Sequence, residues 1–299
     1  MAGTPVIEAN DLVKRFGNLV AVNNLNLQVR EGEVVGFLGP NGAGKTTTIR
    51  MLMGFIRPTS GQAGVLGGRL SAAPALRGRV GYLPGDFRID AGMTGWELLA
   101  WFGSLRGGLD RQRVVELADR LHLDLSRKFG QLSKGNRQKL GVVQAFMHLP
   151  SVLILDEPTS GLDPLIQREF LDMVVEARGR GAAVFFSSHV LPEVSRVADR
   201  VAIIRLGELV SISTVDELLD KARHRLELRY DAPVDAGRFR SVPGVVAVEE
   251  SGRNVVITVD GPVGPAMQTA SSLGGLLRVS TAGDELEDIF LSLYDEAGS

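Results

Sequence analysis

The architecture of the chain follows from one short stretch, Gly39-Pro40-Asn41-Gly42-Ala43-Gly44-Lys45-Thr46. It fits the pattern Gly-x-x-x-x-Gly-Lys-Ser/Thr, and it lies between an apolar run, Val34 to Leu38, and a helix-like segment, Thr47 to Met53. Glycines allow backbone N–H groups to close around phosphate oxygens, and the start of the next helix adds positive potential. Lys45 adds a full charge, and the Thr46 hydroxyl can bind Mg²⁺. The stretch therefore predicts a nucleotide-phosphate loop in an α/β fold.

The rest of the pattern extends this α/β prediction. Apolar runs separated by helix-like segments occur at Val34 to Leu38, Val152 to Leu155, Ala183 to Phe186 and Val201 to Ile204. Continuous apolar runs are typical of strands covered on both faces, which predicts a parallel sheet. The first thirty residues alternate apolar and polar side chains, so we expect an antiparallel β-subdomain. Between the first two runs, Trp96 to Leu105 and Val114 to Leu123 predict a helical insertion.

Two acidic residues, Asp156 and Glu157, end the second apolar run. Ligands of an open α/β sheet bind at the carboxyl ends of its strands. We expect Asp156 to hold Mg²⁺, directly or through water, and Glu157 to orient and deprotonate the water that attacks the γ-phosphate. A solvated Asp-Glu pair that merely ends a strand is the alternative. With the phosphate loop, the pair predicts a P-loop ATPase or GTPase, and no Asn-Lys-x-Asp segment occurs to read guanine.

Composition excludes several other classes of protein. The chain has 299 residues, no cysteine and a formal net charge of −2. Disulfides and thiolate metal sites are therefore excluded, and no basic field favours nucleic acid. The sequence contains no apolar run of about 18 residues and no signal-peptide pattern at its start. We expect a cytosolic protein of about two domains that does not itself span a membrane.

The segment Leu132-Ser133-Lys134-Gly135-Asn136 lies about two dozen residues before the acidic pair. At this position the sequence resembles the ATP-binding cassette (ABC) transporter family, whose signature is Leu-Ser-Gly-Gly-Gln. The resemblance covers about Val6 to Leu218. It implies that two cassettes face each other around two ATP molecules, with Ser133 and Gly135 of one touching the γ-phosphate bound to the other. Lys134 and Asn136 depart from the commonest signature, and we expect function to survive this change.

Three further positions match the family pattern. Ser160-Gly161-Leu162-Asp163 resembles the loop that reaches across the dimer, which implies that Asp163 couples the two sites. His189 resembles the switch histidine that contacts the γ-phosphate, although a lone histidine is more often structural. Phe16 resembles the aromatic residue that stacks on adenine, with core packing as the alternative. The resemblance implies three sets of site residues. The ATP-binding residues are Phe16, Gly39, Pro40, Asn41, Gly42, Ala43, Gly44, Lys45, Thr46, Thr47, Ser133, Gly135 and Asp163. The catalytic residues are Glu157, His189 and Lys45, and the metal ligands are Thr46 and Asp156.

One position departs from the family pattern. Family cassettes place a glutamine after the strand that enters the helical subdomain, where it meets Mg²⁺ or water and senses the membrane subunit. Here Gly81-Tyr82-Leu83-Pro84 is followed by Gly85 and Asp86. Gly85 has no side chain for this role, so either Asp86 substitutes for the glutamine or the contact is absent.

A second, smaller domain is expected after the cassette. From Arg225 onward, short strands, an Ala/Ser/Leu segment and a further strand follow one another, an order that suggests a split βαβ or ferredoxin-like unit. We expect a P-loop cassette at residues 1–220 and a small α+β accessory domain at residues 221–299. Leu286, Ile289, Phe290 and Leu293 have the spacing of a final helix, which packs inward or onto a partner.

These features predict an ATP-hydrolysing subunit of an ABC transporter that energises a separate integral-membrane permease through ATP-driven dimerisation. ATP and Mg²⁺ are the expected cofactors, and a second copy or a related cassette is the expected partner at the cytoplasmic face of the membrane. The tail segment Leu286 to Phe290 resembles the ending of accessory domains behind efflux cassettes, which favours an exporter. The alternative, a non-transport ABC ATPase acting on DNA or ribosomes, is disfavoured by the single cassette, the lack of heptads and the net charge.

Overall fold

The computed structural model describes residues 4–87, 89, 92–220 and 223–281. Contacts along the chain divide it into two compact units, Met1–Ile212 and Ser213–Ser299. The sequence predicts a boundary at 220/221, whereas this division assigns the short helix α8 (Val215–Asp220) to the second unit. Each unit is described by itself below.

A six-stranded sheet forms the centre of the first unit, with the strand order β5-β6-β7-β3-β8-β9. Its strands are β3 (Val34–Leu38), β5 (Val80–Leu83), β6 (Val152–Asp156), β7 (Ala183–Ser188), β8 (Arg200–Arg205) and β9 (Glu208–Thr214). The pairs from β5 to β8 are parallel, which confirms the predicted parallel sheet. Every residue of β3, β6 and β7 is buried, so both faces of these strands are covered and their sequences are unbroken apolar runs.

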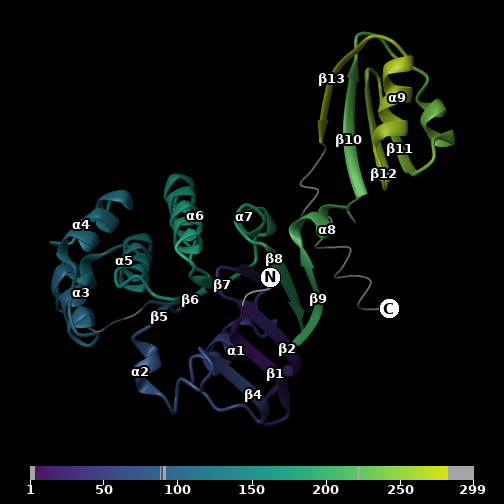
Figure 1. The fold of residues 1–299 in the computed structure, drawn as a ribbon. Coiled ribbons are helices and arrows are strands. Elements are labelled where there is room, and N and C mark those ends of the chain that lie inside the picture. Colours follow the sequence, from purple (N-terminus) through teal and green to yellow (C-terminus); the bar gives the residue numbers. More distant parts are fainter. Residues whose placement is uncertain (1–3, 88, 90–91, 221–222, 282–299) are drawn as a thin grey trace. The chain divides into compact units, whose positions relative to one another are not determined.

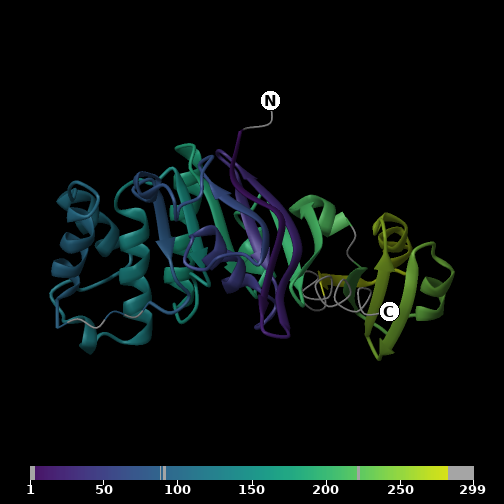
Figure 2. The ribbon, with the colours of Figure 1, turned by 90° about the horizontal axis from the view of Figure 1, so that it is seen from below.

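A second sheet, antiparallel and three-stranded, packs in the same unit. It has the order β2-β1-β4, with β1 at Pro5–Phe16, β2 at Leu19–Arg30 and β4 at Ser60–Val65. Helix α1 (Lys45–Leu52) contacts β1, β2 and β4 on one side and β6 on the other, so it lies between the two sheets (Figures 1 and 2). Buried side chains of both sheets and α1 form one hydrophobic cluster. The predicted antiparallel subdomain is confirmed, with β4 as an additional strand.

The other face of the parallel sheet carries helices. Helix α5 (Lys134–Phe146) contacts β5, α6 (Pro164–Gly179) contacts β7, and α7 (Leu191–Ser195) contacts β3 and β7. The predicted helical insertion is present, as α3 (Gly95–Ser104) and α4 (Arg111–Arg120), which lie with α5 at one end of the unit (Figures 1 and 2). Two short helical turns, α2 (Pro74–Arg77) and η1 (Phe129–Gln131), complete this part.

The second unit is a four-stranded antiparallel sheet with the order β11-β12-β10-β13. Along the chain its elements are β10 (Arg223–Tyr230), η2 (Ala236–Ser241), β11 (Val245–Ser251), β12 (Asn254–Asp260), α9 (Gly264–Ser272) and β13 (Leu276–Thr281). Alternate residues of β10 and β12 are buried and pack with η2 and α9 in a separate hydrophobic cluster. The predicted final helix at Leu286 to Leu293 lies outside the described residues.

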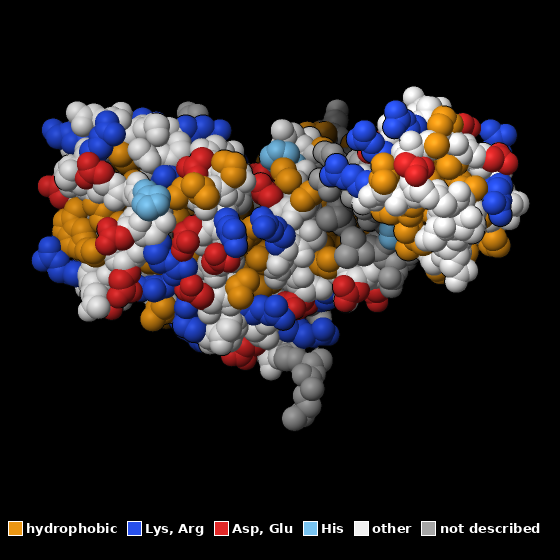
Figure 3. Space-filling model, turned by 90° about the horizontal axis from the view of Figure 1, so that it is seen from above, with side chains coloured by type: hydrophobic (Ala, Val, Ile, Leu, Met, Phe, Trp, Pro, Cys, Tyr) orange, Lys and Arg blue, Asp and Glu red, His pale blue; other side chains and the backbone are white. Residues whose placement is uncertain are grey.

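The surface is mixed in charge on the face that Figure 3 shows, where acidic and basic side chains are interspersed. A hydrophobic patch gathers at the end of the first unit that carries α3 and α4. Trp101, Leu105 and Val115 are exposed on and beside these helices. Among the helices of the described ranges, we find none with the length and apolar content needed to cross a lipid bilayer.

Candidate ATP-binding site

The phosphate loop joins β3 to α1 and is held against neighbouring backbone at both ends. Gly44 has a φ of 111°, and a Cβ atom there would lie 2.6 Å from the Ala21 carbonyl oxygen. A Cβ atom at Gly39 would lie 2.5 Å from the Ile204 carbonyl oxygen. Both positions therefore require glycine, one for its backbone conformation as well as for the close approach.

Lys45 is the first residue of α1, and its side chain is only 5% exposed. Its ammonium group donates hydrogen bonds to the carbonyl oxygens of Gly39 and, at 3.1 Å, of Pro40. The same nitrogen lies 3.1 Å from Glu157 Oε1. A buried ammonium group is costly without such partners, and these contacts offset that cost beside the phosphate loop.

The acidic pair ends β6 and is ordered by the neighbouring strand β7. Asp156 is 1% exposed, and its Oδ1 accepts a 2.6 Å hydrogen bond from Ser187 Oγ. Glu157 has a φ of 48°, in the left-handed region, and its N–H donates to the same Ser187 oxygen at 3.0 Å. Gln138 Nε2 donates to the Glu157 carbonyl oxygen at 3.1 Å. These bonds fix the direction in which the Glu157 side chain leaves the backbone.

His189 completes a chain of three polar side chains. Its Nδ1 lies 2.8 Å from Glu157 Oε2, while Glu157 Oε1 faces Lys45. Glu157 Oε1 is buried and receives no hydrogen bond from the described residues. It is held there by the ion pair with the Lys45 ammonium. The structure thus brings together the three residues predicted to be catalytic, with a carboxylate between two nitrogen groups.

An open pocket of about 450 Å³ lies over the phosphate loop. Its lining residues are Phe16, Leu19, Val20, Ala21, Pro40, Asn41, Gly42, Gly44, Lys45, Thr46, Thr47, Glu157 and Leu206. Phe16 is 49% exposed, and the Lys14 ammonium lies 4.9 Å from its ring centroid. The ring is therefore not a core side chain and presents a face on which a flat base can stack.

Seven of the predicted site residues do not line this pocket: Gly39, Ala43, Ser133, Gly135, Asp156, Asp163 and His189. Three of the seven, Ser133, Gly135 and Asp163, come from the starts of α5 and α6. Ser133 caps α5, where its Oγ accepts from the Asn136 N–H at 3.2 Å, and Asp163 caps α6. A Cβ atom at Gly135 would lie 2.8 Å from the Gly161 carbonyl oxygen, so the first turn of α5 packs against the turn before α6. Within one chain, these residues form a separate surface from the phosphate loop.

Comparison with known proteins identifies the family. The ABC transporter family model matches residues 22–160. An uncharacterized ABC transporter ATP-binding protein of Nostoc sp. (strain PCC 7120) is 39% identical over 208 residues, 67% of this chain and 62% of that protein. The bacitracin transport ATP-binding protein BcrA of Enterococcus faecalis is 32% identical over 308 residues, 98% of this chain and 97% of that protein. The chain belongs to the ABC transporter family.

A solved ABC transporter cassette has the same fold. This structure of an ATP-binding subunit of an ABC transporter superposes with a TM-score of 0.66 at 30% identity, covering 71% of this chain and 91% of that one. The predictions of a P-loop cassette and of membership in the ABC transporter family are thereby confirmed. The chain spans 62% of the length of the Nostoc relative.

Gly85, where the sequence predicts the family's glutamine position, lies beside the acidic pair. A Cβ atom at Gly85 would lie 3.3 Å from Asp156 Oδ2. Gly85 and the exposed Asp86 both line a cavity that also touches Lys134 and Arg137 of the signature region. Position 85 is thus beside the Asp156 carboxylate.

The residues present suit Mg²⁺. The Thr46 hydroxyl and the Asp156 carboxylate are hard oxygen donors, and Asp156 Oδ2 is the oxygen that Ser187 does not engage. No group of three or more His, Asp or Glu side chains forms a metal cage in the described part of the chain. Such a site suits an ion that takes its other ligands from water and substrate phosphates.

Two positioning residues of the ABC site were not predicted. Ser187 binds the Asp156 carboxylate and the Glu157 N–H, and Gln138 binds the Glu157 carbonyl oxygen. Each is a polar residue that is buried, Ser187 at the end of an apolar strand and Gln138 on the inward face of α5. A buried polar residue in an apolar context is the signal that points to them.

Proposed function

We propose that this chain hydrolyses ATP as one of two cassettes that close on each other and drive an ABC exporter. The observation that carries the proposal is the Glu157 carboxylate, held between Lys45 and His189 at the phosphate loop. A γ-phosphate in the pocket competes with Glu157 for the Lys45 ammonium. Release from that ion pair leaves the carboxylate able to accept a proton from water.

The residues then divide the reaction between them. Glu157 orients a water molecule and takes its proton while the new O–P bond forms and the bond between the β- and γ-phosphates breaks. Lys45, the loop N–H groups and His189 stabilise negative charge on the phosphate oxygens. Thr46 and Asp156 would hold Mg²⁺, which supplies further positive charge at those oxygens when bound. Phe16 stacks on adenine.

A second cassette completes the site. Ser133, Gly135 and Asp163 lie outside the pocket of their own chain, on a surface formed by the N-terminal ends of α5 and α6. The N-terminus of α5, a helix of 13 residues, carries positive potential suited to a phosphate. Closure of a dimer would bring the partner's copy of this surface to the γ-phosphate, so that hydrolysis is linked to opening and closing.

Glu157→Gln tests the hydrolytic assignment, because the amide keeps the shape of the side chain but not its basicity. We expect turnover to fall by about 10²- to 10⁴-fold, while ATP still binds and an ATP-loaded dimer accumulates in sizing chromatography. The matched control for Glu157→Gln is Glu31→Gln, which makes the same change at an exposed position. A second variant, Lys45→Ala, should lose ATP affinity. A Glu157→Gln variant that keeps its turnover, or that stays monomeric with ATP, would contradict the proposal.

A groove beside the helical subdomain is the proposed contact for the permease. It has a volume of about 320 Å³ and is lined by Met53, Phe55, Arg77, Val80, Tyr82, Pro84, Phe87, Ile89, Phe102, Arg106 and Gln144. Phe55 is 56% exposed at its rim and lies edge-on to Tyr82. Apolar walls with two arginines fit a permease helix that carries apolar side chains and an acidic residue.

Co-purification tests this contact. Phe55→Asp should reduce the recovery of the permease from detergent extracts of the native host, because the new carboxylate would be desolvated in an apolar groove. The control is Val246→Asp, which places the same charge at an equally exposed position of the second unit. Equal recovery with both variants would exclude this groove as the contact.

The second unit is proposed to be a ferredoxin-like accessory domain of an export system. Its strands alternate with η2 and α9, and the order β11-β12-β10-β13 is the one that a split βαβ repeat produces. The match to BcrA, by its name a protein of bacitracin transport, extends over 98% of this chain and so includes this unit. We place the assembly at the cytoplasmic face of the membrane, through the permease.

A further inference from the structure

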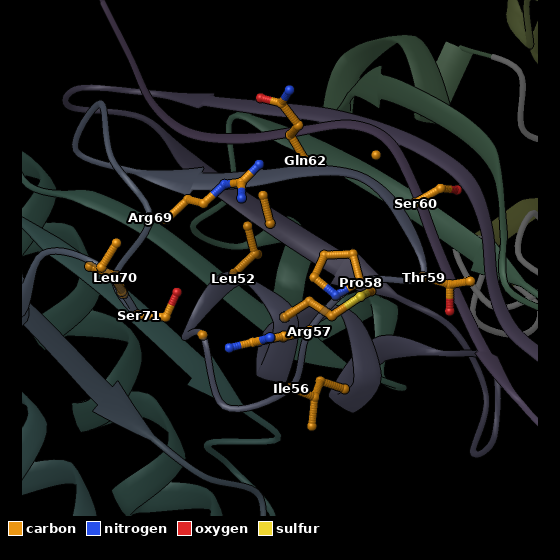
Figure 4. Close-up of a pocket in the computed structure, with 15 residues that line it drawn as sticks. Leu52, Ile56, Arg57, Pro58, Thr59, Ser60, Gln62, Arg69, Leu70 and Ser71 are labelled. Carbon is orange, nitrogen blue, oxygen red and sulfur yellow. The ribbon is translucent and has the colours of Figure 1, made fainter.

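A second pocket of the cassette lies away from the phosphate loop (Figure 4). It has a volume of about 390 Å³ and shares no lining residue with the ATP pocket. Its walls come from the end of α1, the segment between α1 and β4, the first part of β4 and the segment after β4. The lining residues are Met51, Leu52, Gly54, Ile56, Arg57, Pro58, Thr59, Ser60, Gly61, Gln62, Ala63, Arg69, Leu70, Ser71 and Ala72.

The pocket combines an apolar floor with a cationic rim. Leu52 and Leu70 are each 1% exposed and form part of the hydrophobic core below it. Arg57 and Arg69 are exposed and extend over the pocket from two different elements, the segment after α1 and the segment after β4 (Figure 4). The Ser71 side chain lies at the rim near them.

Among the described residues, the two arginines have no partner that neutralises them. Neither guanidinium group forms an ion pair or a side-chain hydrogen bond with any residue in the described part of the chain. By contrast, the neighbouring Arg77 donates to the Leu70 carbonyl oxygen at 3.0 Å. Two unpaired positive charges over one concave surface favour an anion. The forked N–H groups of guanidinium match the oxygens of a phosphate group, and hydroxyl groups at the rim add donors.

We propose that this pocket binds a phosphate group carried on a partly apolar molecule, with Arg57 and Arg69 as its ligands. The phosphate accepts hydrogen bonds from the two guanidinium groups, and the apolar part covers Leu52 and Leu70. A phospholipid headgroup and a soluble phosphate compound share this chemistry, and the two sources are separated by the probes below.

The pocket is connected to the ATP site through strand β1. The Lys14 ammonium donates to the Arg57 carbonyl oxygen at 2.8 Å and also lies over the Phe16 ring. The Thr59 N–H donates to the Val13 carbonyl oxygen at 2.8 Å. A ligand that orders the 57–59 segment therefore also orders the end of β1 that carries Phe16. Such coupling is reciprocal, so ATP and the phosphate ligand raise each other's affinity.

Direct binding tests the proposal on the full chain. The phosphate loop is first saturated with Mg²⁺ and a non-hydrolysable ATP analogue, so that it cannot take up the probe. One probe is inorganic phosphate, followed by calorimetry, and the other is a phosphatidylcholine vesicle with or without phosphatidylglycerol, followed by flotation. The test variant is Arg57→Gln with Arg69→Gln. The control is Arg168→Gln with Arg240→Gln, which removes the same charge from exposed sites without described partners.

We expect the test variant to bind at least about tenfold more weakly than the control, because two charge-assisted contacts are lost. Weakened binding of inorganic phosphate supports a soluble phosphate compound as the ligand. Arginine-dependent binding to the phosphatidylglycerol vesicles alone supports a lipid headgroup. If neither probe binds, or if test and control variants bind equally, the proposal is overturned. Thermal melting confirms that all variants fold.

Discussion

One serine hydroxyl orders both acidic residues of the ATP site. Ser187 Oγ accepts the Glu157 N–H at 3.0 Å and donates to Asp156 Oδ1 at 2.6 Å. The left-handed backbone of Glu157, with φ at 48°, costs about 1–3 kcal/mol for a residue with a side chain. The bonds from Ser187 and Gln138 offset this cost. The backbone conformation is therefore part of how the carboxylate reaches Lys45.

His148 gives the cassette a predictable response to pH. Its Nε2 lies 3.3 Å from the Val80 carbonyl oxygen, and its buried Nδ1 has no partner within the described ranges. Burial, together with the nearby Arg106 charge, lowers the pKa of His148 from 6.5 to about 4. Between pH 4 and pH 6.5, His148 is therefore protonated more fully in the unfolded chain than in the folded one. The stability contributed by neutral His148 is thus complete above pH 6.5 and is lost as the pH falls towards 4.

Because of this residue, we expect the free energy of unfolding to be about 1 kcal/mol lower at pH 5.5 than at pH 7.5. Urea unfolding of the wild type and of His148→Asn at both pH values measures it, since the variant lacks the titrating ring. His122→Asn is the control, because His122 is exposed. If the wild type and His148→Asn lose equal stability on acidification, the pH effect does not come from His148.

The site residues divide into those that the sequence predicted and those that depend on the fold. Lys45, Asp156 and Glu157 belong to short contiguous motifs, so their spacing alone indicates phosphate chemistry. Ser187 and Gln138 act through hydrogen bonds to partners 31 and 19 residues away in sequence. Such pairs depend on which strands become neighbours, and local spacing carries no information about that.

At the scale of whole elements, one arginine ties the helical subdomain to the core. Arg120, on α4, donates to both carboxylate oxygens of Glu176, at 2.8 and 2.7 Å, and its Nε lies 2.5 Å from Glu169 Oε1. The two glutamates are seven residues apart on α6, so they lie on the same face of that helix. The geometry is bidentate and therefore stronger than that of an ordinary surface pair.

Arg120→Gln should loosen the contact between α4 and α6. We expect a loss of about 1 kcal/mol in the free energy of unfolding, because the pair is partly solvated, and a smaller loss at high salt. Hydrogen exchange of the α4 amides should accelerate in parallel. Arg168→Gln, on α6 but without a described partner, is the matched control. An equal effect from both substitutions would show that these ion pairs do not hold the subdomain.

The elements that the sequence predicted well are those with both faces buried. Strands β3, β6 and β7 have only buried residues, and their unbroken apolar runs marked them as strands. Strands β4 and β9 were not predicted, because they lie at sheet edges and most of their side chains are exposed or half-buried. Their pairing is decided by neighbouring strands, and an exposed edge places little constraint on sequence.

At the scale of the molecule, the chain behaves as two units with separate cores. The hydrophobic cluster of the cassette draws on residues up to Ile212, and that of the second unit on residues from Leu226 onward. The cassette core is built from two sheets and their helices, and the core of the second unit from one sheet with η2 and α9. Folding of one unit therefore does not require burial of side chains from the other.

Removing Lys221–Ser299 should leave a folded cassette, because the chain up to Asp220 keeps every strand of the two cassette sheets. We expect one cooperative melting transition and an affinity for the ATP analogue within about threefold of the full chain, since none of the ATP-pocket residues is removed.

The alternative role of the second unit is to support the closed dimer. Combining the truncation with Glu157→Gln separates the two, because that substitution is expected to hold the ATP-loaded dimer. A shortened chain that binds ATP but no longer dimerises would assign the second unit to dimer closure. A shortened chain that fails to fold would refute the independence of the two cores.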